Sequence, residues 1–156
     1  MTSQSKARTT ATPTNLRIPG WSRRAVYTSL LALAGTGFLW LLAHHLLRKP
    51  GEFGELVHPL EPWSMKLHGA AAMFALFFTG SILHSHIRRA IRSGRNRFSG
   101  WAMVLVLSVL TLSGYWLYYF TSEETRPLWS TLHWVVGAAL CGLVLTHVWI
   151  GRRSRS

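Results

Sequence analysis

The sequence is poor in cysteine and in charged residues, and both deficits limit what the protein can be. Cys141 is the single cysteine in 156 residues, which excludes an intramolecular disulfide framework and a thiolate metal cluster. We expect this residue to be a small buried side chain within an apolar run. Charged residues make up only 14% of the chain, well below the roughly one quarter that is typical of soluble domains. The composition therefore argues against a soluble protein.

The hydrophobic residues, 49% of the chain, gather into four runs at 25–47, 63–87, 100–120 and 128–150. Each run reaches the roughly 20 residues that a helix needs to cross the hydrocarbon core of a bilayer. We therefore predict an all-α integral membrane four-helix bundle with up-down-up-down topology. Residues 1–24 are expected to form a disordered tail, 25–151 the four-helix domain and 152–156 a basic C-terminal tail.

The net charge of +12 is distributed unevenly about the four runs. Most of the 17 basic residues lie in the N-terminal tail, in the connection after the second run and at the C-terminus, whereas all five acidic residues fall in the other two connections. The positive-inside rule then places both termini in the cytoplasm of a bacterial cell, with the protein in the inner membrane. Topology thus accounts for the basicity, and we expect membrane lipid, not nucleic acid, as the partner of these charges.

Arg23 and Arg24 precede the first apolar run, which also fits a twin-arginine signal peptide cleaved after Ala34. The run continues without charge as far as Leu47, which is longer than a typical signal-peptide core. We therefore favour an uncleaved first span.

Histidines stand at both ends of the second and fourth runs, where ionisable side chains are costly and usually functional. His133 and His147 are 14 residues apart, so they lie within about 40° of one helix face and about 21 Å apart along the axis. His68 and His86 are 18 residues apart, which is five full turns and again one face. His84 points to nearly the opposite side unless a bulge near Gly80 rotates it. The stripe between His68 and His86 holds Ala72, Ala75, Thr79 and Ile82, which leave space instead of filling a core.

These positions predict one histidine pair near each membrane face. The outer pair is His68 with His133, and the inner pair is His147 with His86, or alternatively with His84. Each pair would supply both axial ligands of a haem iron, an arrangement that favours electron transfer over ligand activation. Arginines beyond the inner pair, Arg88, Arg89, Arg152 and Arg153, are placed to bind haem propionates. Topology alone explains these arginines equally well.

The remaining histidines admit other roles. His44 and His45 end the first run at about the depth of His68 and His133, so one of them could replace His68 or help to bind a quinone. Histidines at a helix end are more often simple interfacial anchors, and His58 is expected to be solvated. The two halves of the chain also share a weak repeat. Thr36-Gly37 corresponds to Ser113-Gly114, and Leu-His opens both the second and the fourth run, as a duplicated hairpin would explain.

At these residues the chain resembles the di-haem four-helix membrane cytochrome b superfamily. That superfamily includes the cytochrome b subunits of formate dehydrogenases and hydrogenases and small bacterial b-type cytochromes. The likeness is strongest from Leu132-His133 to His147-Val148-Trp149, and His68 also matches. Several relatives place an inner histidine on the first helix, where this chain has Val26, Tyr27 and Thr28. The resemblance implies two b-type haems that relay electrons across the membrane, commonly to or from quinone or quinol.

The leading hypothesis is therefore a bis-histidine electron carrier between quinone and a periplasmic redox protein or enzyme subunit. Whether the chain is an enzyme stays open, since it fits an oxidoreductase subunit better than a stand-alone catalyst. Two alternatives use the histidines without electron transfer. One is a metal-ion transporter or channel, and the other is a membrane anchor subunit for a partner enzyme.

Overall fold

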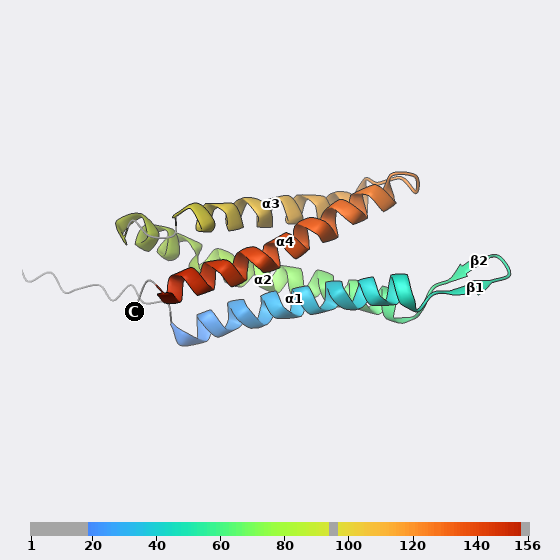
Figure 1. The fold of residues 1–156 in the computed structure, drawn as a ribbon, viewed down its shortest axis with the longest axis horizontal. Coiled ribbons are helices and arrows are strands. Elements are labelled where there is room, and N and C mark those ends of the chain that lie inside the picture. The colour runs from blue at the N-terminus through green and yellow to red at the C-terminus, as the bar shows by residue number, and fades with distance from the viewer. Residues whose placement is uncertain (1–18, 94–96, 154–156) are drawn as a thin grey trace, which may run out of the picture.

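The computed structural model describes the backbone of residues 19–93 and 97–153, with side chains for 19–85, 98–150 and 153. Within these residues four helices run roughly antiparallel, each beside the next (Figure 1). They are α1 (Gly20–Leu46), α2 (Leu60–Ser93), α3 (Arg97–Tyr119) and α4 (Arg126–Arg153). The predicted all-α four-helix architecture is therefore present. The predicted tail of residues 1–24 overlaps the start of α1, and residues 1–18 and 154–156 lie outside the described part.

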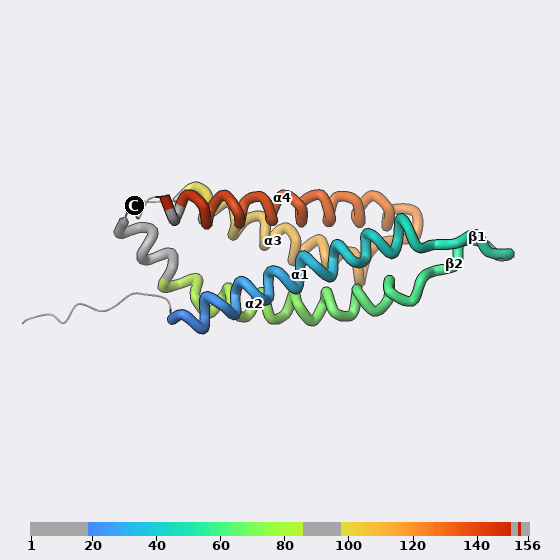
Figure 2. Tube along the Cα trace, turned by 60° about the horizontal axis from the view of Figure 1, so that its bottom comes forward, coloured from blue at the N-terminus to red at the C-terminus, as the bar shows by residue number. Residues whose placement is uncertain are grey.

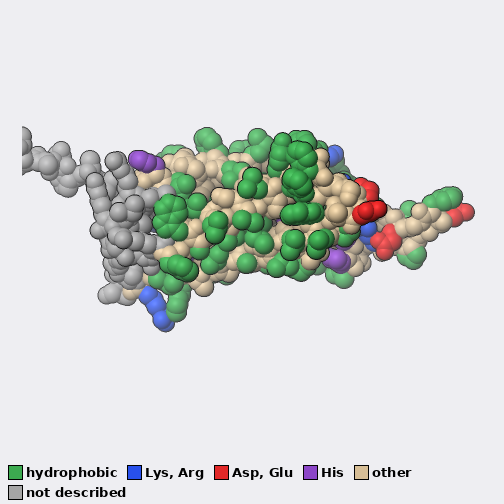
Figure 3. All heavy atoms as spheres, turned by 90° about the horizontal axis from the view of Figure 1, so that it is seen from above, with side chains coloured by type: hydrophobic (Ala, Val, Ile, Leu, Met, Phe, Trp, Pro, Cys, Tyr) green, Lys and Arg blue, Asp and Glu red, His purple; other side chains and the backbone are tan. Residues whose placement is uncertain are grey.

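All four helices are long and apolar enough to cross a membrane. Their outer surfaces carry large hydrophobic side chains that a soluble protein would bury, such as Leu31, Met73 and Leu112, each more than two-thirds exposed. In the space-filling view these side chains cover the middle of the molecule (Figure 3). Lipid is the solvent that such a surface requires. Cys141 is also exposed, so the expectation that it is buried was wrong.

The helices pair as two hairpins, α1 with α2 and α3 with α4, and the hairpins touch each other much less than their own helices do. Figure 2 shows the two layers. Small side chains make the close contact within the first hairpin, where Ser29, Ala43, Ala71 and Ala75 are buried. In a membrane small residues let helix backbones approach closely, which gains dispersion and interhelical hydrogen bonds. The contacts between the two helical hairpins include a pair of histidines, described below.

A short β hairpin, which the sequence analysis did not predict, joins α1 to α2. Strand β1 (Lys49–Gly51) pairs antiparallel with β2 (Gly54–Leu56). Gly54 has a φ of 116°, a conformation that side-chain-bearing residues rarely adopt, so glycine is needed where the turn closes. The hairpin extends beyond the helices along the long axis of the bundle (Figure 1). We call this end of the molecule the hairpin end.

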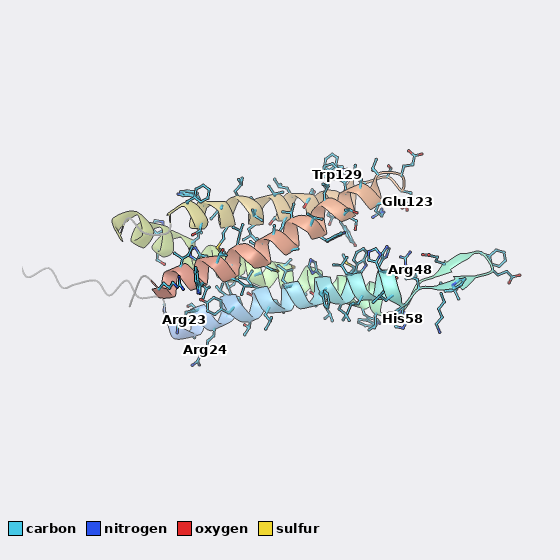
Figure 4. The ribbon with its side chains drawn as sticks, viewed as in Figure 1. Arg23, Arg24, Arg48, His58, Glu123 and Trp129 are labelled. Atoms are coloured by element: carbon cyan, nitrogen blue, oxygen red, sulfur yellow. The ribbon has the colours of Figure 1, made fainter. Side chains whose placement is uncertain are left out.

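The two ends of the bundle differ in charge. Arg23 and Arg24 lie at the start of α1, opposite the hairpin end, whereas Glu123 and Arg48 lie at the hairpin end (Figure 4). Acidic side chains gather there around the base of the hairpin (Figure 3). The positive-inside rule is applied to such a separation of charge between the two ends of a membrane bundle. The placement of the termini in the cytoplasm stays a prediction.

Candidate functional site: two facing histidines

His68 on α2 and His133 on α4 come from different helical hairpins. Their rings meet between the two helix pairs, near the end of the bundle that carries the β hairpin. Their ring centroids are 6.3 Å apart and the ring planes are nearly perpendicular, at 76°. Both side chains are half-buried. The two residues that the sequence predicted as the outer pair are therefore brought together, and this contact joins the two hairpins where the helices themselves touch little.

The tautomer of His68 follows from its hydrogen bonds. Its Nδ1 lies 3.0 Å from the carbonyl oxygen of Leu33 and 3.2 Å from the hydroxyl of Thr36. A carbonyl oxygen can only accept, so Nδ1 must carry the proton. The Thr36 hydroxyl in turn donates to the carbonyl of Ala32 at 2.7 Å. Nδ1–H therefore points to α1, and the unprotonated lone pair belongs to Nε2.

His133 is held in the same way by the second hairpin. Its Nδ1 lies 2.8 Å from the hydroxyl oxygen of Ser113 on α3. When that hydroxyl donates to the Leu110 carbonyl, 3.2 Å away, its oxygen accepts from Nδ1–H of His133. Both facing imidazoles thus have a neutral Nε2 that is free to bind a metal, and in the described part of the chain no hydrogen bond reaches either Nε2.

The Thr-Gly and Ser-Gly repeat in the sequence coincides with the residues that contact the two histidine rings. Thr36-Gly37 on α1 and Ser113-Gly114 on α3 each place a hydroxyl against Nδ1 and a glycine beside the ring. A Cβ built on Gly37 would lie 3.1 Å from Cε1 of His68, and one on Gly114 would lie 3.4 Å from Cε1 of His133. The missing side chains therefore let both imidazoles pack directly against helix backbone.

These distances predict that substitution by alanine disturbs the neighbouring histidine more at Gly37 than at Gly114. Gly37→Ala should displace His68 by a few tenths of an ångström, because 3.1 Å is shorter than ordinary carbon contacts, whereas Gly114→Ala needs almost no adjustment. The measurement is the chemical shift of each histidine ring by NMR in the two variants. Equal shifts in both, or a larger shift in Gly114→Ala, would contradict the prediction.

The geometry at His68 and His133 fits a metal ion held between two axial imidazoles. A histidine nitrogen binds a metal at about 2 Å and lies about 1 Å from its ring centre, so such a pair has centroids about 6 Å apart. The observed 6.3 Å agrees with this value. The hydrogen bonds between Nδ1 and a hydroxyl or carbonyl oxygen are those that metal-binding histidines usually make with their other ring nitrogen. Haem needs only these two protein ligands, so its chemistry suits the donor set.

The helix face between the predicted ligands of α2 lies inside the bundle and is partly filled. Ala75 is fully buried by other residues, and Ala72, Thr79 and Ile82 are half-buried, so the predicted small-residue stripe faces the interior but leaves no open space at Ala75. The hydroxyl oxygen of Thr79 is buried without a hydrogen-bond partner in the described residues. Buried hydroxyls nearly always have a partner, so this oxygen is available to a group that binds beside the stripe.

The opposite end of the bundle holds His147. Its Nδ1 lies 2.8 Å from the hydroxyl of Ser99 on α3, so a hydroxyl again supports a histidine of α4. His84 is exposed, and α2 continues as an α-helix through Gly80 without the bulge that would turn His84 inward. Three predicted site residues have side chains outside the described part of the structure: His86, Arg88 and Arg152. The predicted pairing of His147 with His86 therefore stays a prediction. Arg153 stacks on Trp149 with its guanidinium 3.8 Å from the ring centroid.

His44 belongs to a separate cluster at the hairpin end. Its Nδ1 is 3.1 Å from Glu61, and its ring stacks on Trp40 with centroids 4.6 Å apart. Glu61, which is buried in the first turn of α2, also accepts two hydrogen bonds of 2.7 Å from Arg48. Hydrogen bonds from Arg48 to Glu61 and Glu55 raise the pKa of Arg48 above its usual range, so it stays charged. His44 therefore binds Glu61 in this cluster and does not replace His68 in the pair with His133.

Sequence reasoning missed this cluster. It placed all five acidic residues in the connections without assigning a partner to Glu61, whose side chain is only 6% exposed. In the described residues no group of three or more histidine, cysteine or acidic side chains is arranged to hold a metal ion alone. A search of protein-family models, of curated proteins and of solved structures finds no match to this chain.

Proposed function

We propose that the chain is a membrane electron carrier of the di-haem four-helix cytochrome b type, with two b-type haems each held by two histidines. The observation that carries the proposal is the outer pair. His68 and His133 come from different hairpins, their centroids are 6.3 Å apart, and both rings present an unprotonated Nε2. Histidines that served only to hold helices together would use both ring nitrogens in hydrogen bonds, whereas here only Nδ1 of each ring is hydrogen-bonded in the described residues.

In this proposal His68 and His133 hold the outer haem, and His147 with His86 holds the inner one. Haem bound through two imidazoles supplies a one-electron couple with no open coordination site. The chain's own residues determine the ligand orientation. Thr36 and the Leu33 carbonyl fix the ring of His68, Ser113 fixes that of His133, and Ser99 contacts the ring of His147. The hydroxyl of Thr79 lies between the two levels, on the face that both haems would share.

The proposed redox partners are quinone or quinol within the bilayer and a periplasmic redox protein or enzyme subunit beyond the hairpin end. We further propose that the protein lies in the bacterial inner membrane with both termini in the cytoplasm, which the charge distribution supports. Exposed acidic side chains at the hairpin end support an encounter with a basic soluble partner. Glu55 and Glu123 have exposed fractions of 66% and 91%.

Redox difference spectroscopy of the purified protein tests the proposal. We expect the α-band of b-type haem, a ratio of two haems per chain, and reduction of both haems by a quinol. The absence of an α-band would overturn the proposal and leave a non-redox transporter. Haem that is present but resists reduction by quinol would instead favour a membrane anchor with haem as a packing group.

A further inference from the structure

A second set of titratable side chains lies outside the proposed haem site, at the junction of α1, α2 and the β hairpin. Glu61 is buried and accepts hydrogen bonds from two nitrogens of Arg48. Its Oε2 is also 3.1 Å from Nδ1 of His44. A carboxylate can only accept, so Nδ1 of His44 carries a proton, and in the neutral imidazole Nε2 holds the lone pair. The arrangement is a carboxylate-oriented imidazole, which is how proteins prepare histidine as a base.

The surroundings of His44 indicate the kind of molecule that it would meet. One face of its ring stacks on Trp40, and its side chain is 30% exposed. In the described residues no hydrogen bond reaches its Nε2. Leu41 and Leu47, three residues before and after His44 and so on its side of the helix, are partly exposed, Leu47 at 39%. A base at the membrane boundary, flanked by apolar side chains, is accessible to a lipid-soluble molecule that bears an acidic O–H group.

The position of His44 relative to the histidine pair adds a second reason. Thr36, which contacts His68, precedes His44 by eight residues on α1, so the two levels are about 12 Å apart along the helix axis. A base on the aqueous side of a redox centre at that distance is placed for a substrate whose oxidation releases protons.

We propose that His44 is the proton acceptor of a hydroquinone-binding site formed with Trp40 at the hairpin end, an inference that rests on the proposed electron-carrier function. The hydroquinone ring lies against this aromatic pair, and its hydroxyl donates to Nε2 of His44. For each electron that passes to the oxidised iron centre proposed at His68 and His133, one O–H bond breaks and its proton moves to Nε2. His44 gives the first proton to the outer water before it accepts the second. Two such steps convert hydroquinone to quinone.

Glu61 and Arg48 then act as positioning residues. The buried carboxylate fixes the ring of His44 and stabilises the imidazolium when it forms, while Arg48 keeps Glu61 ionised. The charged and titratable groups that face His44 are Glu61 from α2, Arg48 from the connection, Glu55 from β2 through Arg48, and His45 from its own helix.

The chain supplies a matched control for the test. His45 is adjacent, exposed, and touches the ring of His44 edge-on, but it is not part of the hydrogen-bonded cluster. We compare His44→Phe with His45→Phe, since phenylalanine can keep the stacking on Trp40 and removes only the nitrogens. Binding of decyl-substituted benzohydroquinone to the protein in lipid nanodiscs is measured calorimetrically without oxygen. We expect His44→Phe to weaken binding about tenfold or more, the loss of one hydrogen bond to a basic group, and His45→Phe to change it less than about twofold.

A second measurement uses the unmodified protein, so its result does not depend on whether a variant folds. The ¹⁵N resonances of His44 should show Nδ1 protonated and Nε2 free, and Nε2 should shift when the hydroquinone is added. Wild-type affinity in His44→Phe, equal losses in both variants, or an unmoved Nε2 would each overturn the proposal. Binding of hydroquinone at His44 requires no iron. A protein that lacks haem but binds hydroquinone at His44 would therefore contradict the electron-carrier function and not the binding site.

Discussion

His133→Ala is expected to reduce the haem content from two to one per chain. The substitution removes one of the two histidines that we propose as ligands of the outer haem. His68 keeps its hydrogen bonds to Leu33 and Thr36, which belong to the other hairpin, so the fold of α1 and α2 should persist. The measurement is the haem-to-protein ratio, together with the amplitude of the reduced α-band.

Three other substitutions serve as comparisons for this result. His147→Ala should also leave one haem per chain, because it disables the other site. His44→Ala and His58→Ala should retain both haems, since His44 pairs with Glu61 and His58 caps the start of α2 by accepting from the Leu60 N–H at 3.2 Å. Full haem content in His133→Ala, or an equal loss in His44→Ala, would show that the outer ligands are wrongly assigned.

Hydropathy predicted the four helices because a bilayer imposes one strong requirement, about 20 apolar residues in succession. The ends were less predictable. Helix α2 begins at Leu60 and α1 at Gly20, both earlier than the apolar runs, because a helix continues into the interface wherever its backbone still benefits from hydrogen bonding. The β hairpin was missed because strands of three residues, one of them containing Pro50, show no alternating pattern.

The site was predictable to the extent that depth and helix face determine it. His68 and His133 were assigned to one level from their positions in the apolar runs, and the hydroxyl–glycine repeat marked their supports, although it was interpreted only as a duplication. The Leu33 carbonyl carries no sequence pattern, so the tautomer required the structure. The pairing of Glu61 with His44 and Arg48 was not predictable, since it depends on how the connection folds back over α2.

That fold of the connection depends on Arg48, and Arg48→Ala should be strongly destabilising. The guanidinium makes two hydrogen bonds of 2.7 Å to Glu61 and one of 3.2 Å to Glu55 on β2, so it ties the base of the hairpin to α2. Its removal leaves Glu61 buried with only His44 as a side-chain partner. Removing one partner of a buried ion pair costs about 3 kcal/mol, because the remaining charge is left uncompensated. We expect a clearly lower unfolding temperature in detergent, followed by tryptophan fluorescence.

Graded variants distinguish the buried pair from general surface effects. Glu55→Ala removes only the exposed partner and should cost about 0.5 kcal/mol, and Lys49→Ala, next to Arg48 on the exposed strand, should cost less still. Arg48→Lys keeps the charge but cannot reproduce the two parallel hydrogen bonds, so its stability should fall between the wild type and Arg48→Ala. If Arg48→Ala were no less stable than Glu55→Ala, Glu61 would have found another partner or become protonated. The hairpin would then be anchored by its strands and not by this guanidinium.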